Sequence, residues 1–337
     1  MSSIHLHIGP EKTGTKTIQS FLKANSGNLN KQSIYIPEFL GWAHRKITCL
    51  AFNKESKDDF FITEGALSEE CKELKITECR NEFNHHASGL KNYNWVVSCE
   101  FMQSRLQHTK ELQTLKDTLE KHFSKINIIL YIRKQIDAAV SLWSTAVQSG
   151  MPWTELPSPS DVSYAFNHKN TIERWKSVFG EAITVRIFDK NEFIDGSLIK
   201  DFCFASSIEW DESFVTPDAE NESMSSLAIQ ALSKINKGLP YIIDGAINKN
   251  RSNIADLIKQ HFILYPKFTP NPGQVASYFD YYQESNEWVR AKYFKNKANL
   301  FSKNIVFCTQ KEAVITLDNV LDIYGDLVVK ILQSKSI

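Results

Sequence analysis

The chain has 337 residues, of which 42% are hydrophobic and 23% are charged, and its 39 lysines and arginines equal its 39 aspartates and glutamates in number. This composition is typical of a folded globular protein and excludes a largely disordered chain. The zero formal net charge argues against a partner held by bulk charge, such as nucleic acid or an anionic membrane. No run of the sequence approaches the roughly 18 uncharged apolar residues of a membrane span.

The first residues and the cysteines indicate the compartment. The chain opens with MSSIHLHIGPEK and enters a strand-like stretch without a basic and then apolar signal segment. Its six cysteines are scattered, with no CxxC pair and no histidine at metal-ligand spacing, so we expect reduced, mostly buried thiols and no metal site. We therefore expect a cytoplasmic protein, whose oligomeric state the sequence does not indicate.

Short apolar strands alternate with helices along the first part of the chain. We expect strands at residues 4–8, 33–37, 94–100, 126–132 and 183–188. Because strands that alternate with helices form mostly parallel sheets, the pattern predicts an α/β fold with helices on both faces. Residues 40–90 lack a strong period and form the expected insertion on the acceptor side, and residues 205–337 are expected to be mostly helical. We expect a single domain over residues 1–337, although the length also allows two close lobes.

The turn after the first strand is the most informative segment. It reads Gly9-Pro10-Glu11-Lys12-Thr13-Gly14-Thr15-Lys16-Thr17 and leads into a helix. In that context, backbone amides and the positive end of the helix converge on one point, which is a phosphate site. The hydroxyls of Thr13, Thr15 and Thr17 can add donors. An ordinary turn that caps a helix is the alternative.

This turn is a near miss for the Walker A loop, which needs Gly, four residues, Gly, and then Lys directly followed by Ser or Thr. Gly9 and Gly14 have the right separation. However, Thr15 intervenes, so Lys16 comes one residue late. A slip of one residue on a helix turns a side chain by about 100°. We therefore expect Lys12, inside the loop, to contact the transferred group instead.

The segment Lys12-Thr13-Gly14-Thr15 resembles the 5′-phosphosulfate loop of sulfotransferases that use 3′-phosphoadenosine-5′-phosphosulfate (PAPS), which reads Lys-Ser/Thr-Gly-Thr-Thr. A bacterial subgroup of that family opens with His-Ile-Gly, as His7-Ile8-Gly9 does here. Lys16 stands where the family usually has a second Thr, and Thr17 can partly substitute for it. The resemblance implies that the residues from Lys12 to Thr17 bind the cofactor.

The same family carries a strand that ends in Arg and a helix with Ser eight positions later, and Arg133 and Ser141 have that spacing here. Arg presents a planar fork that matches a phosphate, and open α/β sheets bind ligands at the carboxyl ends of their strands. Ser141 lies off the apolar stripe of its expected helix. Taken singly, a salt-bridged surface arginine and a solvated serine are the alternatives. Two anion sites in this order favour a doubly phosphorylated nucleotide.

The resemblance is specific over about residues 4–23 and 126–150. It implies a three-layer, P-loop-like α/β fold with a central mostly parallel sheet, an insertion after the second strand and a helix-rich C-terminal part. It also implies an enzyme that transfers a sulfuryl group from PAPS to an acceptor hydroxyl. Lys12 would stabilise charge on the leaving phosphate, and no metal is required for this chemistry.

The transfer needs a general base for the acceptor proton. Glu100 closes the third expected strand, beside the phosphate turn, and is the first candidate. A salt bridge that braces the loop is the alternative role for this carboxylate. The rival bases are His7, His44, His85 and His86.

The acceptor is the part that the sequence determines least. We expect a sugar hydroxyl on a polysaccharide or glycolipid precursor, while a small alcohol, lipid or peptide stays open. Several aromatic residues could stack on a sugar, but packing of the insertion explains them as well and is favoured: Phe39, Trp42, Phe60, Phe61, Trp153 and Tyr164.

Two other functions compete with sulfuryl transfer. One is a P-loop nucleotide or small-molecule kinase that uses Mg-ATP, for which Asp189 is a loose candidate as the metal-binding carboxylate. The other is a non-catalytic nucleotide-binding protein. The combination of Lys12, Arg133 and Ser141 argues against both.

Overall fold

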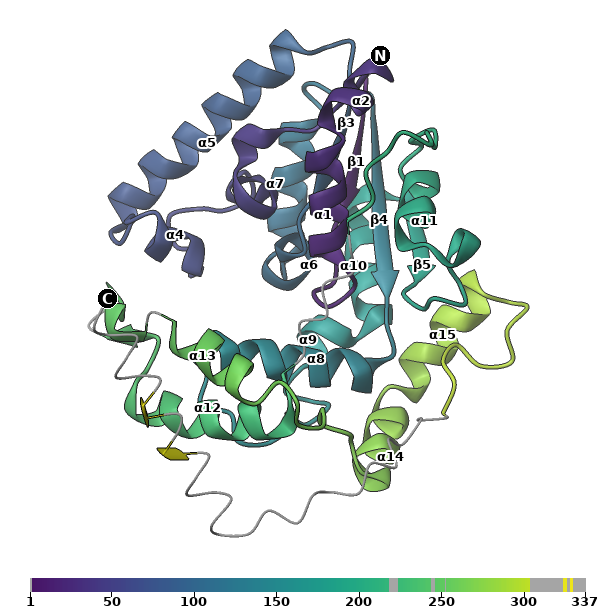
Figure 1. The fold of residues 1–337 in the computed structure, drawn as a ribbon. Helices are drawn as coiled ribbons and strands as arrows, with labels where there is room; N and C mark the ends of the chain where they lie inside the picture. The colour runs from purple at the N-terminus through teal and green to yellow at the C-terminus, as the bar shows by residue number, and fades with distance from the viewer. Residues whose placement is uncertain are drawn as a thin grey trace. The chain divides into compact units, whose positions relative to one another are not determined.

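The computed structural model describes residues 2–217, 224–243, 246–251, 253–303, 324–325 and 328–329, without the side chains of residues 246, 247 and 250. The chain forms two compact units (Figure 1). Unit 1 comprises Met1–Ala138, Ser160–Glu220 and Tyr281–Phe301. Unit 2 comprises Ala139–Pro159, Asn221–Asp280 and Ser302–Ile337.

Unit 1 is built on a five-stranded parallel sheet with the strand order β2-β3-β1-β4-β5 (Figure 1). Its strands are β1 (Ser3–His7), β2 (Ile34–Tyr35), β3 (Asn94–Ser98), β4 (Lys125–Ile132) and β5 (Ile183–Ile187). All five predicted strands are therefore confirmed. The central strand β1 pairs with β3 and β4, and Leu6 lies opposite Val97 on one side and Ile128 on the other.

Both faces of the sheet are buried, as expected for parallel strands. Along β1, Ile4 and Leu6 belong to the core on one face. On the other face His7 packs against the rings of Tyr131 and Phe202, with ring centroids 5.6 Å away in both cases. The alternation of apolar residues and histidines in β1 thus reflects two different cores.

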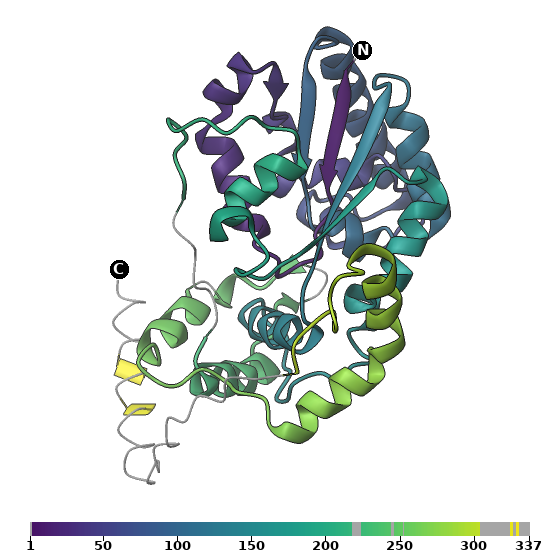
Figure 2. The same ribbon diagram turned by 90° about the vertical axis from the view of Figure 1, so that its right-hand side faces the viewer.

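One face of the sheet is covered by α1 (Thr15–Ala24), α2 (Ser26–Lys31) and α11 (Leu198–Ala205). Ile18 and Phe21 of α1 recur at helical spacing and pack with Val96 and Ile129 of the sheet. Figure 2 shows β1, in purple, beside these helices. The apolar stripe expected for the first helix is confirmed.

The opposite face is covered by α5 (Glu69–Gly89), α7 (Thr109–Leu119) and α10 (His168–Phe179). Leu115 of α7, Trp175 of α10 and Phe83 of α5 are fully buried in this core. The helix α15 (Gln283–Tyr293) adds Val289 to it. The described residues therefore form the predicted three-layer α/β fold around a central parallel sheet.

Residues 40–90 are largely helical and share the core of the sheet. They begin at the last residue of the 3-10 helix η1 (Glu38–Leu40). They contain η2 (Trp42–His44), α3 (Lys46–Cys49), α4 (Asp59–Thr63) and α5. Although α5 has 21 residues, only a narrow stripe of it is buried: Ile76, Cys79, Phe83 and Ala87. Such a narrow stripe explains why the sequence shows no strong period here.

The aromatic residues considered for stacking on a sugar divide into two groups. Phe60 and Phe61 are buried in the core, so the packing interpretation is confirmed for them. For Trp42 it is wrong, since this side chain is 69% exposed, and Tyr164 is 48% exposed. Both exposed rings come from short helical segments, η2 and α9 (Ser163–Phe166), which have too few residues to bury every large side chain.

Unit 2 is mainly helical. Its core joins Trp143 and Val147 of α8 (Gln135–Gln148), Leu232 of α12 (Ser226–Gly238) and Ile258 of α13 (Ile254–His261). The other elements of the described residues are α6 (Phe101–Arg105), η3 (Ile194–Gly196), β6 (Ile242–Ile243), β7 (Ala246–Ile247), η4 (Lys249–Arg251) and α14 (Pro272–Tyr281).

The predicted helix-rich C-terminal part is confirmed as far as residue 303, apart from the small hairpin of β6 and β7. Most of residues 304–337 lie outside the described residues. Within the described part of the chain, no helix has the length and apolar character that crossing a bilayer requires.

Candidate active site

The phosphate turn lies at the carboxyl end of β1, in the middle of the sheet. From β1 the chain passes to β2, which lies on one side of β1. From β3, on that same side, it crosses to β4 on the other side of β1. Such a reversal of strand order creates a crevice in which open α/β sheets bind ligands. Because the strands are parallel, Glu100 after β3 and Arg133 after β4 reach the same edge as the turn.

The backbone of the turn is shaped for a close approach. Gly9 and Gly14 have φ angles of 95° and 73°, which favour glycine. A Cβ atom on Gly9 would lie 2.9 Å from the Cα atom of Glu100. On Gly14 it would lie 2.4 Å from Cδ2 of Leu198. Both glycines are thus required by conformation and by space.

The N-terminus of α1 lies in the turn that follows β1. Gly14 is its N-cap residue, and no side chain of the described residues caps the helix. Among the residues that the structure describes, no backbone carbonyl accepts the N–H groups of Gly14 and Thr15. Uncapped N–H groups at the positive end of a ten-residue helix form an anion-binding site.

The three threonines of the turn differ in their contacts. Thr13 is fully buried and donates its hydroxyl to the carbonyl of Pro10 at 2.6 Å, which braces the loop. The Oγ1 atom of Thr15 is also buried, and it has no hydrogen-bond partner among the described residues. Thr17 is half-buried on α1, whereas Lys16 is exposed. Thr15 is therefore the hydroxyl that most needs a ligand.

Lys12 and Arg133 come together at the turn. Lys12 has a φ of 71° and is half-buried. Nη1 of Arg133 donates to the carbonyl of Lys12 at 2.7 Å, and its guanidinium lies 5.3 Å from the ring centroid of Phe188. Nε2 of His168 lies 2.9 Å from the carbonyl of Arg133 and holds that residue from the other side. Burial lowers the pKa of Arg133, while Asp137 acts in the opposite direction.

Ser141 lies on the part of α8 that belongs to unit 2. It is half-exposed. Its role beside Arg133 therefore stays a prediction from the resemblance.

Glu100 lies directly against the turn and is 8% exposed. Nε2 of Gln19 donates to its Oε2 atom at 3.0 Å and to the carbonyl of Ser98, also at 3.0 Å. Burial raises the pKa of Glu100, and the charge of Glu11 raises it further, whereas the Gln19 bond and Lys12 act to lower it. Among the described residues Glu100 has no ion pair within bonding distance. A buried carboxylate with a raised pKa and no salt bridge is suited to accept a proton.

Sequence reasoning missed Gln19. This residue follows Thr15 by four positions, so both side chains lie on the same face of α1. The signal that could have found Gln19 is a polar residue one helical turn after Thr15, on the same face of the helix.

Two of the rival histidines are buried and held by Ser98. Nδ1 of His7 lies 2.8 Å from the Ser98 hydroxyl, and burial lowers the pKa of His7 to about 3. Nδ1 of His44 accepts the Ser98 N–H at 3.0 Å, and burial lowers the pKa of His44 to about 4. The other nitrogen of neutral His44 therefore carries the proton and has no lone pair to offer.

The other two histidines lie near the opposite edge of the sheet. His85 and His86 are on the last turns of α5, shortly before β3 begins at its amino end. His85 is exposed, and His86 stacks on Phe39 with ring centroids 4.1 Å apart. Of the five predicted bases, Glu100 is thus the one that contacts the turn.

The known proteins that resemble this chain assign it no reaction. No family model matches the chain. An uncharacterized protein of Archaeoglobus fulgidus is 26% identical over 197 residues, which are 56% of this chain and 52% of the archaeal protein. The chain therefore spans about half the length of this curated relative.

Three solved structures are similar over most of the chain. A sulfotransferase from Alicyclobacillus acidocaldarius has a TM-score of 0.47 and 12% identity, with 85% of this chain and 94% of that chain covered. The sulfotransferase domain from the curacin biosynthetic pathway has a TM-score of 0.40 and 11% identity, with 84% and 97% covered. The sulfotransferase domain from the Synechococcus PCC 7002 olefin synthase has a TM-score of 0.34 and 11% identity, with 80% and 95% covered. At these values no residue role carries over, so the chemistry must come from the site.

Proposed function

We propose that the chain is a sulfotransferase that moves a sulfuryl group from PAPS to an acceptor hydroxyl. The observation that carries the proposal is the hydrogen bond of 2.7 Å from Arg133 to the carbonyl of Lys12. It joins the uncapped turn to a second cationic group, as a nucleotide with two separate phosphate groups requires.

The residues of the turn fit this donor. The N–H groups of Gly14 and Thr15 and the unpaired hydroxyl of Thr15 would bind the 5′-phosphosulfate. Arg133 keeps donors beyond its bond to Lys12 and would bind the 3′-phosphate. A Cβ atom on Gly14 would clash with Leu198, so the glycine preserves the shape of this cradle.

The proposed reaction is an in-line displacement at sulfur. The acceptor oxygen forms a bond to sulfur while the bond from sulfur to the bridging oxygen of the 5′-phosphate breaks. The acceptor proton passes to the carboxylate of Glu100, and 3′-phosphoadenosine-5′-phosphate leaves. The ammonium group of Lys12 stabilises the negative charge that develops on the bridging oxygen.

A sugar hydroxyl is the acceptor that the surroundings of Glu100 support best. The exposed ring of Trp42 lies 6.0 Å from that of Phe101, the residue after Glu100. Tyr164 is 48% exposed, while partial burial of its hydroxyl and then the charge of Glu11 raise its pKa. Exposed aromatic faces beside hydrogen-bonding groups suit the apolar and polar sides of a sugar ring.

A kinase that uses Mg-ATP fits this site less well. Lys16 is the second residue of α1 and is exposed, so its side chain is turned away from the position of a Walker lysine. Asp189 follows the edge strand β5, which β4 separates from β1. Its carboxylate accepts the N–H of Asn191 at 2.9 Å within a local turn.

Nucleotide titration tests the proposal. We expect 3′-phosphoadenosine-5′-phosphate to bind without metal, and Arg133→Ala to weaken it at least about tenfold, which corresponds to one charge-assisted contact. The affinity for 5′-AMP, which lacks the 3′-phosphate, should barely change. Lys134→Ala is the matched control, because Lys134 is the next residue and pairs with Asp137 instead.

Two results would contradict the proposal. One is tighter binding of Mg-ATP than of 3′-phosphoadenosine-5′-phosphate. The other is an equal loss of both adenine nucleotides in Arg133→Ala, which would make this residue structural.

A further inference from the structure

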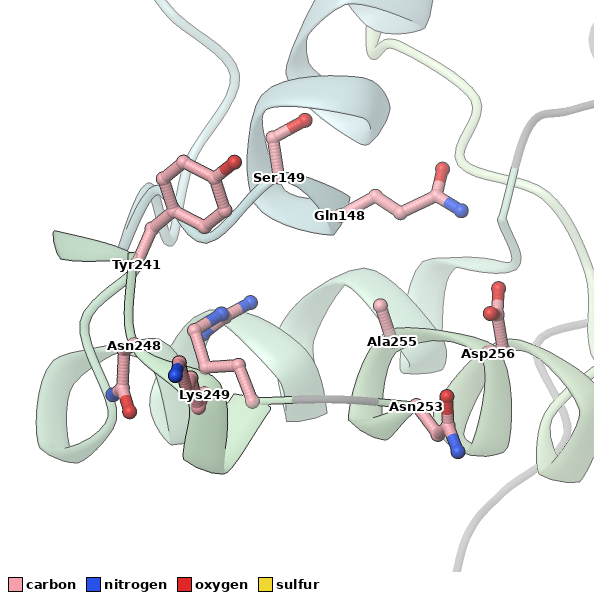
Figure 3. Close-up of a pocket in the computed structure, with 9 residues that line it drawn as sticks. Gln148, Ser149, Tyr241, Asn248, Lys249, Asn253, Ala255 and Asp256 are labelled. Atoms are coloured by element: carbon pink, nitrogen blue, oxygen red, sulfur yellow. The ribbon is translucent and has the colours of Figure 1, made fainter. Parts of the chain in front are cut away.

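Unit 2 contains a cavity of about 270 Å³ between the end of α8 and the residues that lead into α13 (Figure 3). In Figure 3, Gln148 and Ser149 lie on one side of it, and Asn253 and Asp256 lie on the other. Tyr241 closes one end. The wall thus includes amide, hydroxyl and carboxylate groups beside its apolar surface.

Arg251 brings a buried positive charge to this wall. The residue is 8% exposed, and Nη1 donates to Oδ1 of Asn236 and to the carbonyl of Leu239, both at 2.6 Å. Within the described part of the chain Arg251 forms no ion pair, and Nε and Nη2 donate to no group. Burial lowers its pKa, yet an arginine stays protonated at neutral pH.

A buried charge without an opposite charge nearby is costly, so it calls for a counter-ion. Asp256 does not supply it, since it lines the cavity without pairing with Arg251. Arg251 therefore lines the cavity, and its Nε and Nη2 atoms have no acceptor among the described residues.

Gly150 shapes the same wall. Its φ is 107°, and a Cβ atom there would lie 2.6 Å from Cβ of Tyr241 and 3.2 Å from Cζ of Arg251. Any larger residue would displace the two side chains. The close packing keeps the ring and the guanidinium in place beside the cavity.

We propose that this cavity binds a small organic anion the size of a monosaccharide, with an oxyanion group on Arg251 and hydroxyl groups on the amides of Gln148 and Asn253. A planar guanidinium matches a phosphate or a carboxylate. Side-chain amides donate and accept, as hydroxyl groups require. The volume lies just below the range of about 300–1,000 Å³ that drug-sized ligands fill, which restricts the ligand to about one ring.

Calorimetric titration with glucose 6-phosphate, glucuronate and glucose tests the proposal on the full chain. We expect one or both anions to bind and neutral glucose to bind at least about tenfold more weakly, the loss of a charge-assisted contact. The two anions distinguish a phosphorylated ligand from a carboxylated one. Equal binding of glucose, or no heat with any of the three, would overturn the proposal.

Variants locate the binding. Ala255→Leu fills the cavity from the first turn of α13, and Arg251→Gln removes the positive charge. Each variant should therefore abolish the heat of anion binding. Lys259→Gln, on the last turn of the same helix, removes a charge away from the cavity and should bind normally. Ala255→Leu leaves the hydrogen bonds of Arg251 intact and serves if Arg251→Gln does not fold.

The phosphate turn could also bind these anions, so Lys12→Ala is the separating variant. Heat that persists in Lys12→Ala and disappears in Ala255→Leu supports a site in unit 2. Heat with the reverse pattern belongs to the turn and overturns the proposal. This inference does not depend on the proposed sulfotransferase activity.

Discussion

Glu100 and Lys12 belong to the same small turn region and carry opposite charges. Glu100 packs against Gly9 and accepts a hydrogen bond from Gln19. The backbone of Lys12 accepts a hydrogen bond from Arg133. Hydrogen bonds to other segments of the chain therefore hold both residues at the turn.

Lys12→Ala should lower the turnover number by about 10²-fold or more, because a group that stabilises leaving-group charge contributes mainly in the transition state. Its effect on the affinity for 3′-phosphoadenosine-5′-phosphate should be much smaller. Steady-state kinetics and calorimetry measure the two effects. Lys23→Ala, an exposed change at the other end of α1, is the control. Weaker binding with normal turnover would show that Lys12 is only an anchor.

Glu100→Gln should lower turnover by about 10²-fold with nucleotide affinity retained, because the amide cannot accept a proton. Burial raises the pKa of Glu100 above its value in the unfolded chain. Ionisation of this group therefore lowers the free energy of unfolding as the pH rises from the unfolded pKa through the folded pKa. The variant should therefore melt no lower than the wild type at pH 8, and any advantage should shrink toward pH 5. A lower melting temperature with normal turnover would indicate a structural brace.

Gln19→Leu separates positioning of Glu100 from its chemistry. The hydrogen bond from Gln19 favours the charged carboxylate, so its loss should raise the pKa of Glu100 further. The acid limb of the turnover profile should then move to higher pH, while the rate at high pH is mostly retained. An unshifted profile would mean that Gln19 does not act on the base.

At the scale of elements, α1 begins at the proposed anion site. A Cβ atom on its N-cap Gly14 would lie 2.4 Å from Leu198 of α11 and 2.8 Å from Phe188, which follows β5. Three elements therefore meet closely at one residue without a side chain.

Gly14→Ala should destabilise the fold by about 1–3 kcal/mol, since a left-handed φ and a contact of 2.4 Å both oppose a methyl group. It should also weaken nucleotide binding. Gly27→Ala, in α2 with nothing within 4 Å of the added atom, should be neutral or stabilising. Chemical denaturation of both variants checks this, and similar stabilities would contradict the tight contact.

On the scale of the whole molecule, buried histidines make the fold sensitive to acid. Burial lowers the pKa of His5, His44 and His168 to about 4 and that of His7 to about 3. The unfolded chain takes up these protons near pH 6.5 while the folded chain does not. Each histidine therefore lowers the free energy of unfolding by about 1.4 kcal/mol per pH unit as the pH falls from 6.5 toward the pKa of that histidine in the folded chain.

His168→Gln should reduce the loss of unfolding free energy at falling pH by about 1.4 kcal/mol per pH unit. The amide can still donate to the carbonyl of Arg133 but does not titrate. Urea denaturation at pH 7, 6 and 5 measures the slope. His85→Gln, an exposed change on α5, should leave the slope unaltered. Equal slopes for His168→Gln and the wild type would contradict the burial of this ring in its neutral form.

Local pattern was sufficient for the strands and for the presence of a glycine-containing turn after the first of them. The alternation in β1 and the apolar runs of β3 and β4 predict buried parallel strands, because each run records the burial of its own backbone. The turn of Gly9 to Thr17 is likewise a contiguous segment whose glycines report their own conformation.

Only the tertiary structure could decide the contacts between distant segments. The bond from Arg133 to Lys12 joins residues 121 positions apart, and the bond from Gln19 to Glu100 joins residues 81 positions apart. The narrow buried stripe of α5 and the exposure of Trp42 also depend on what packs against them. Sequence pattern reports the environment of a residue along its own element, whereas a pairing across the sheet depends on strand order, which no local pattern records.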